Sequence, residues 1–186
     1  LIYMQKELFN FINGRNSVSE FLNTIRQGIP SAVFGVTESF KSYLVSTIED
    51  KVLFVVKDEL SANVYAEYIR SFSGKKTVVL TPKDEILVAN RAFSKDRLYK
   101  RISAIYQSKS ADVIISTPEA LMQIFPKNVA SYSFEKDSDY LREDYINALI
   151  SMGYKRVDVI ESQGCFSVRG DILDLYPINA ENPVKI

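Results

Sequence analysis

Histidine is absent from the 186-residue sequence, and cysteine occurs only once, at Cys165. Without histidine, Ser-His-Asp and Cys-His catalysis and histidine-ligated metal sites are excluded. One cysteine can form neither an internal disulfide nor a thiolate zinc cluster. No charged partner is implied beside Cys165, which is interpreted as an inert thiol. We therefore expect a chain that binds no metal and needs no cofactor.

An excess of charge of one sign is also lacking. Lys plus Arg and Asp plus Glu both number 23, so the formal net charge is zero. This balance argues against a domain whose whole surface holds DNA phosphates, although a local basic patch remains compatible with it.

Long apolar runs are missing as well. No run approaches the roughly 20 residues that cross a bilayer, and the first ten residues, LIYMQKELFN, carry charge too early for a signal peptide. We therefore expect a protein of the cytoplasm with no membrane contact.

Short apolar runs alternate with longer amphipathic segments between residues 30 and 125. The runs lie at 31–36, 51–56, 76–80 and 112–117, and because they are apolar on both faces they predict a parallel sheet covered by helices.

The segments between these runs predict the helices. Ser17 and Glu20 have the spacing of a capping box, and a further helix is expected to begin at Pro118 after Thr117. Helices are also expected at 58–72 and 94–107, with apolar stripes formed by Leu60, Val64, Tyr68 and Phe72 and by Leu98, Ile102 and Ile105.

The pattern changes near residue 131, where SYSFEKDSD indicates the exit from a first domain. Beyond it we expect a helix at 140–153 that ends at Gly153, then strands at 154–160, 165–177 and 183–186, with a bulge near Gly170. The predicted fold is an α/β parallel-sheet, P-loop-like domain with helices on both faces (1–132). A smaller α+β antiparallel domain follows (133–186), incomplete at its C-terminal end.

The stretch GVTESFKSYL, residues 35–44, resembles the phosphate-binding motif G-x-x-x-x-G-K-[ST]. Gly35, Lys41 and Ser42 match it, but Phe40 replaces the central glycine and Glu38 adds a carboxylate that would repel phosphates. No strand-end Asp-Glu pair follows, because DVIISTPE ends in Ser116 and Thr117, and the Asp-Glu of KDEI (83–86) lies in a loop-like setting. The motif is interpreted as a degenerate, non-functional P-loop, and ATPase activity is not expected.

The run MGYKRVDVIESQGCFSVRGDILDLYPINAENPVKI, at residues 152–186, completes the pattern. It matches the sequence LGYxRVDxVExxGxFSVRGDIxDxFPxxxxxPVRIEFF of one family. Together with the degenerate P-loop, it makes the chain resemble the amino-terminal, UvrB-like module of the bacterial transcription-repair coupling factor, Mfd. The resemblance spans most of the chain. UvrB is the close competitor, but it has GVTGSGKT in the loop, and GVTESFKS favours the Mfd family, whose module lacks the ATPase motifs.

This resemblance implies a non-catalytic module that binds UvrA, and so brings nucleotide excision repair to stalled RNA polymerase. The UvrA-contacting arginine of VRGD falls on Arg169. A second basic contact, Arg in PVRIEFF, falls on Lys185, which keeps the charge but not the bidentate fork. RNA polymerase and DNA would be bound only by downstream domains that are missing here, which include an ATP-driven DNA translocase.

Other interpretations remain open at this point. The chain could be a UvrB-like P-loop ATPase or helicase fragment that acts on damaged DNA. It could bind DNA through Lys155, Arg156, Arg169 and Lys185. Arg169 could also be structural, paired with Asp171 or Asp174.

The first prediction concerns the degenerate P-loop. Titration with Mg-ATP in a calorimeter should give no binding in the micromolar range, and Lys41→Ala should leave the trace unchanged. Micromolar binding that disappears in Lys41→Ala would instead establish a working nucleotide site.

Overall fold

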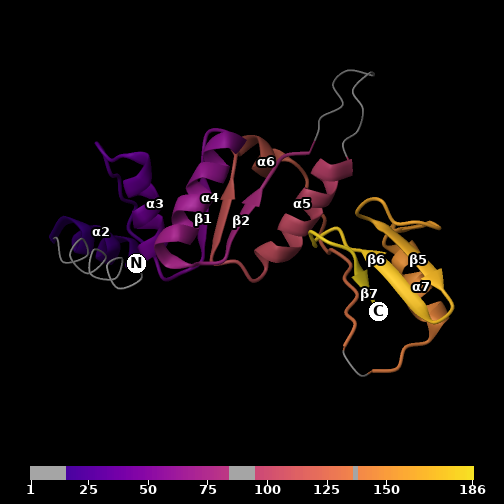
Figure 1. Ribbon diagram of the computed structural model, residues 1–186. Helices are drawn as coiled ribbons and strands as arrows, with labels where there is room; N and C mark the ends of the chain where they lie inside the picture. Colours follow the sequence, from indigo (N-terminus) through magenta and orange to yellow (C-terminus); the bar gives the residue numbers. More distant parts are fainter. Residues whose placement is uncertain (1–15, 84–94, 136–137) are drawn as a thin grey trace, which may run out of the picture. The chain divides into compact units, whose positions relative to one another are not determined.

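The computed structural model describes residues 16–83, 95–135 and 138–186 (Figure 1). Asp84 and Glu85, the pair in KDEI, lie outside them. Contacts group the chain into two compact units, one formed by Leu1–Leu80 with Ser110–Pro118 and the other by Thr81–Lys109 with Glu119–Ile186. The domain boundary after residue 132 stays a prediction.

A three-stranded parallel sheet forms the centre of the first unit (Figure 1). Its strands are β1 (Val52–Val55), β2 (Thr77–Leu80) and β3 (Val113–Ser116), in the order β1-β3-β2. Both pairs are parallel, with Val52 and Thr77 each opposite Val113. Three of the four predicted strands of this sheet are thus confirmed.

The fourth predicted strand, at 31–36, is wrong. This segment has no strand conformation, and Phe34 is 88% exposed. Gly28 and Gly35 have positive φ angles of 70° and 71°, and Pro30 lacks a backbone N–H, so only a short extended stretch remains to pair.

Helix α4 (Glu59–Ser73) packs on one face of the parallel sheet. Asp58 caps its first turn by accepting a hydrogen bond from the backbone N–H of Ser61 (2.7 Å), and Gly74 ends it with a φ of 66°. The residues that α4 buries are Ala62, Tyr65, Ala66 and Ile69.

The stripe predicted for this helix is therefore wrong, since Leu60 is 77% and Tyr68 40% exposed. The small side chains of Ala62 and Ala66 lie on the buried face, which allows the helix backbone a close approach to the sheet. Phe72 packs instead against Tyr43 of α3 (Glu38–Thr47), with 6.0 Å between the ring centroids.

Three further helices precede the C-terminal sheet in the sequence: α2 (Asn16–Arg26), α5 (Lys95–Ser108) and α6 (Pro118–Met122). Ser17 lies inside α2, so it is not the N-cap that the capping-box spacing predicted. Pro118 is the first residue of α6, as predicted. Within the described ranges, no helix is long and apolar enough to cross a membrane.

An arginine is the most deeply buried side chain of α5. Arg101 is only 2% exposed, whereas the predicted stripe of Leu98, Ile102 and Ile105 is half-buried. The Arg101 guanidinium donates hydrogen bonds to the backbone carbonyls of Thr81 and Ala120. It also lies 4.8 Å from the centroid of the Phe125 ring. These contacts compensate the burial of its charge.

The C-terminal part of the chain forms a four-stranded mixed sheet with one covering helix. The elements are α7 (Arg142–Ser151), β4 (Lys155–Arg156), β5 (Cys165–Arg169), β6 (Ile172–Tyr176) and β7 (Val184–Lys185), with strand order β4-β5-β6-β7. β4 runs parallel to β5, and the other two pairs are antiparallel. The predicted class, an α/β unit followed by a smaller α+β unit, is confirmed.

Two details of this sheet differ from expectation. The predicted strand at 165–177 is a β-hairpin, in which Arg169 pairs with Ile172 and Gly170, with a φ of 60°, starts a two-residue turn in place of a bulge. The predicted strand at 154–160 stops at Arg156. Gly153, with a φ of 87°, follows the end of α7, as predicted.

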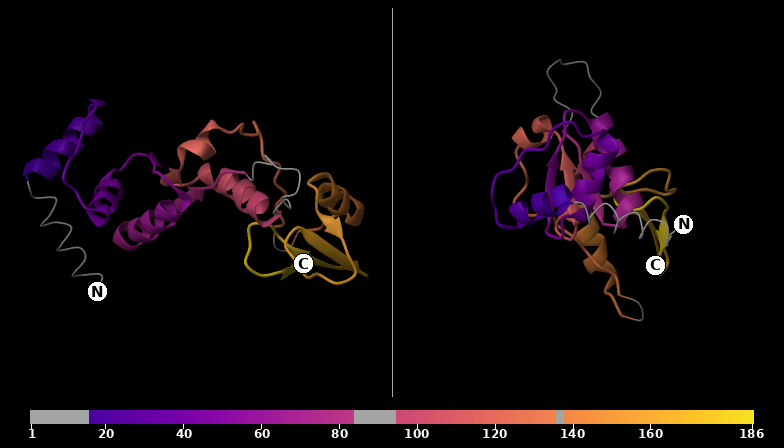
Figure 2. Two further views of the ribbon diagram at one scale, coloured as in Figure 1. Left: turned by 90° about the horizontal axis from the view of Figure 1, so that it is seen from above. Right: turned by 90° about the vertical axis from the view of Figure 1, so that its left-hand side faces the viewer.

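The core of the C-terminal sheet lies between its strands and α7 (Figures 1 and 2). Phe166 of β5 and Leu173 and Leu175 of β6 pack against Tyr145 and Leu149 of α7. Because side chains alternate along a strand, the residues next to Phe166, Leu173 and Leu175 in β5 and β6 face away from this core.

The Phe166 ring is fully buried, so truncation should be costly. Phe166→Ala should lower the free energy of unfolding by about 3–5 kcal/mol, because it removes the ring and leaves a cavity. In urea titrations, Ile172→Thr on the exposed face of the same hairpin should cost less than about 1 kcal/mol. Equal losses for the two variants would mean that Phe166 is not a core residue.

Candidate functional site

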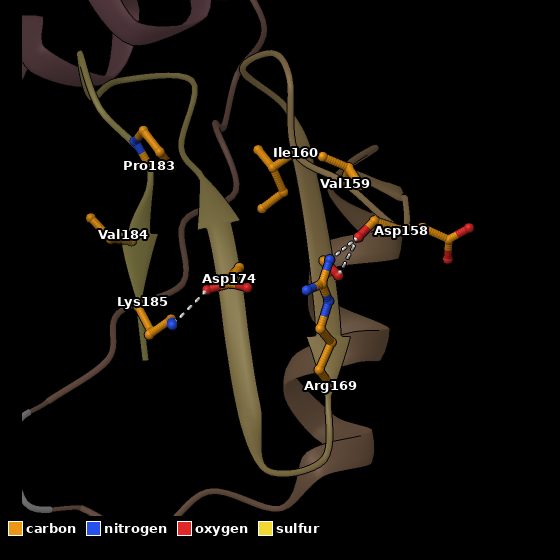
Figure 3. A pocket seen from close by; sticks show the side chains of 9 residues that line it. Asp158, Val159, Ile160, Arg169, Asp174, Pro183, Val184 and Lys185 are labelled. Atoms are coloured by element: carbon orange, nitrogen blue, oxygen red, sulfur yellow. Dashed lines mark hydrogen bonds and ion pairs between the residues drawn. The ribbon is translucent and has the colours of Figure 1, made fainter.

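A pocket of about 370 Å³ opens on the face of the C-terminal sheet that α7 does not cover (Figure 3). Both predicted contact residues, Arg169 and Lys185, line it. Its other lining residues are Asp158, Val159, Ile160, Ser167, Asp174, Pro183 and Val184.

Strand pairing explains why Arg169 and Lys185 meet. Asp174 in the middle strand β6 pairs with Ser167 of β5 on one side and with Lys185 of β7 on the other. Paired residues point to the same face, and Arg169 lies two positions beyond Ser167, so all four side chains share that face.

Arg169 binds backbone rather than a carboxylate. Its Nη2 donates a hydrogen bond of 2.7 Å to the carbonyl of Asp158, whose side chain points away from it (Figure 3). In the part of the chain that the structure describes, Arg169 forms no ion pair with Asp171 or Asp174. Its positive charge is therefore not neutralised by either of these carboxylates.

Lys185 forms a long ion pair with Asp174. Its Nζ lies 4.0 Å from Oδ1 of Asp174, and the two side chains are 70% and 30% exposed. Such a long, solvent-exposed ion pair contributes little to stability. A stronger anionic partner could therefore replace Asp174 at small cost.

The basic residues of the DNA-binding interpretation do not share one face. Lys155 pairs with Cys165 and points to the same side as Arg169, whereas Arg156 pairs with Phe166 and points to the side of the core helix. Both side chains are exposed.

The residues of the degenerate P-loop lie at the start of α3. Gly35 has a φ of 71°, and Thr37 is the N-cap, whose Oγ1 accepts a hydrogen bond from the backbone N–H of Phe40 (3.3 Å). The Phe40 ring stacks on Tyr43 at 5.7 Å, and Glu38 is the first helical residue.

Lys41 and Ser42 differ in accessibility. The Lys41 side chain is exposed, whereas Ser42 is fully buried and its hydroxyl donates to the carbonyl of Glu38 (3.1 Å). The hydroxyl that would hold magnesium in a working motif is thus used inside the helix. Loss of nucleotide binding stays a prediction. Among the described residues, no three His, Cys, Asp or Glu side chains are grouped as a metal site requires.

Sequence reasoning missed the apolar side of the pocket. Val159 and Ile160 were assigned to a strand, but they lie in the loop that connects β4 and β5. The polar residues ESQG at 161–164, which follow them, were the available turn signal. Pro183 and Val184 were recognised only as the start of the last strand.

The hydrogen bond from Arg169 to Asp158 leads to a prediction about the loop. Arg169→Ala should speed amide hydrogen exchange at residues 157–160, because a tether to the loop backbone is lost. Lys185→Ala, which removes the other cation of the pocket, should leave exchange there unchanged. Equal exchange in all three proteins, measured by mass spectrometry or NMR, would show that Arg169 does not hold the loop.

The segment that forms this pocket is similar to part of known proteins. Residues 132–186 match the model of the UvrB interaction domain family. The chain is 23% identical over 188 residues to the transcription-repair-coupling factor of Bacillus subtilis and 22% identical over 205 residues to that of Borreliella burgdorferi. It is also 25% identical over 199 residues to UvrABC system protein B of Neisseria meningitidis.

These alignments cover 95%, 98% and 91% of the chain, respectively. They cover only 16%, 17% and 29% of the relatives, so the chain corresponds to a small part of much longer proteins. The similarity inferred from the sequence motifs is confirmed: the chain is a module similar to the transcription-repair-coupling factors and UvrB, and its residues 132–186 match the UvrB interaction domain.

Proposed function

We propose that this chain is a non-catalytic recruitment module that binds UvrA, and so brings nucleotide excision repair to stalled RNA polymerase. In this proposal the binding surface is the pocket face of the C-terminal sheet. Arg169 and Lys185 supply its positive charges.

The observation that carries the proposal is the convergence of these two residues. They come from strands that are not neighbours, yet they line one solvent-open pocket inside the segment that matches the UvrB interaction domain. The names of the relatives, which include a transcription-repair-coupling factor and a UvrABC system protein, agree with a role in repair.

The chemistry of the pocket favours an acidic partner surface. Arginine offers a planar fork of donors that matches a carboxylate, and arginine is enriched among the residues that dominate binding energy. Lys185 contributes a point charge without the fork. When UvrA binds, Arg169 would form an ion pair with a carboxylate of UvrA, either in place of its hydrogen bond to the backbone carbonyl or in addition to it.

The module itself would perform no chemistry. We assign contacts with RNA polymerase and DNA, and any ATP-driven movement, to other parts of the longer protein. We expect the module to act in the cytoplasm, where it would hold UvrA without a nucleotide of its own.

The test is the affinity of UvrA for the chain, measured by calorimetry or surface-based binding. Arg169→Ala should weaken binding by about 2 kcal/mol, or roughly thirtyfold, while the melting temperature stays nearly unchanged. Arg142→Ala is the matched control, because it removes the same charge from an exposed position on α7, the helix that covers the opposite face.

Three results would contradict the proposal. If Arg142→Ala weakens binding as much as Arg169→Ala, the loss comes from the change in net charge and not from a contact in the pocket. If Arg169→Ala unfolds the domain, its role is structural. Steeply salt-dependent binding to DNA, with no affinity for UvrA, would favour the DNA-binding interpretation.

A further inference from the structure

The loop between β4 and β5 carries an exposed apolar residue next to the positive charges of the pocket. Val159, in this loop, is 64% exposed. The loop backbone is held directly before Val159, because the N–H of Val157 donates to the carbonyl of Phe166 (2.9 Å) and Arg169 donates to the carbonyl of Asp158 (2.7 Å). Ser167 Oγ donates to the same Asp158 carbonyl (3.3 Å). Val159 is therefore presented from an anchored backbone.

The pocket wall continues this apolar character. Ile160 follows Val159 on one side of the pocket, and Pro183 lies on the other side (Figure 3). Single exposed apolar residues are ordinary on protein surfaces. Here they flank an arginine, and binding sites commonly combine an apolar contact with a charged anchor.

We propose that the pocket receives an apolar side chain that stands beside a carboxylate on the partner, with Val159 as the apolar contact that sets specificity. The inference rests on the proposed function and describes the surface of UvrA that the pocket fits. The carboxylate pairs with Arg169 and Lys185, and the neighbouring apolar group packs on Val159 and Ile160.

Charge and size support this occupant. Arg169 has no ion pair with Asp171 or Asp174 among the described contacts, and the ion pair of Lys185 is long and exposed, so a carboxylate completes the charges of the site. A purely charged partner would leave Val159 in water. A volume of about 370 Å³ is at the small end of the range for ligand pockets, about 300–1,000 Å³, and suits side chains rather than a whole helix.

The central variant is Val159→Thr, which keeps a β-branched shape and replaces one methyl group with a hydroxyl. The dissociation constant for UvrA should rise about three- to tenfold. Burying the hydroxyl in the apolar contact costs desolvation free energy, whereas burying the methyl group is favourable. The loss should persist as salt is raised toward about 1 M, whereas the loss caused by Arg169→Ala should shrink, because salt screens charges and not apolar contacts.

The matched control is Ile150→Thr. Ile150 is 54% exposed on α7, over the opposite face of the sheet, and its replacement should leave the affinity unchanged. Melting temperatures of both variants should stay close to that of the parent chain. Far-reaching unfolding of Val159→Thr would overturn the inference, because the residue would then be structural.

The outcomes separate the inference from the proposed function. If the unmodified chain does not bind UvrA, the proposed function fails. If it binds and Arg169→Ala weakens binding, but Val159→Thr behaves like Ile150→Thr, only the apolar contact is wrong. If Val159→Thr instead abolishes self-association in sedimentation experiments and leaves UvrA affinity intact, the occupant is a second copy of the chain and the inference is wrong.

Discussion

The register of the β5–β6 hairpin is the constraint on which the C-terminal module depends. It places Phe166, Leu173 and Leu175 against α7 and turns Ser167, Arg169 and Asp174 to the opposite face. A slip of one residue would exchange the two sets, exposing the core and burying the charges. The two-residue turn that starts at Gly170 holds this register, because its positive φ of 60° suits glycine and few other residues. The turn thus helps to decide which side chains enter the core and which line the pocket.

The strands of the parallel sheet could be predicted from sequence because each is a short apolar run between two longer segments. The segment 31–36 has the same composition, yet it stays unpaired, since pairing depends on neighbours that composition does not report. For α4, two helical stripes compete, and the one with the small residues Ala62 and Ala66 packs on the sheet. Arg101 was missed for a related reason: its burial depends on carbonyls at Thr81 and Ala120, distant in sequence.

The candidate site could be predicted only in part. Family resemblance pointed to Arg169 and Lys185, and the pocket brings them together. No sequence pattern indicates that they share a face, because this follows from two separate strand registers through Asp174. The apolar side of the pocket was hidden for another reason. A run of the type RVDVI is typical of a strand, and only tertiary structure shows that it leaves the sheet after Arg156.

The parallel pairing of β4 with β5 has a consequence for how such modules can diversify. After β4 the chain must travel back along the sheet before β5 can run in the same direction, so geometry sets a minimum length for the loop at 157–164. Deletions there would disturb the pairing, whereas the side chains of Val159 and Ile160 touch the pocket and are absent from the core cluster. Substitutions in this loop can therefore change partner preference without repacking the interior.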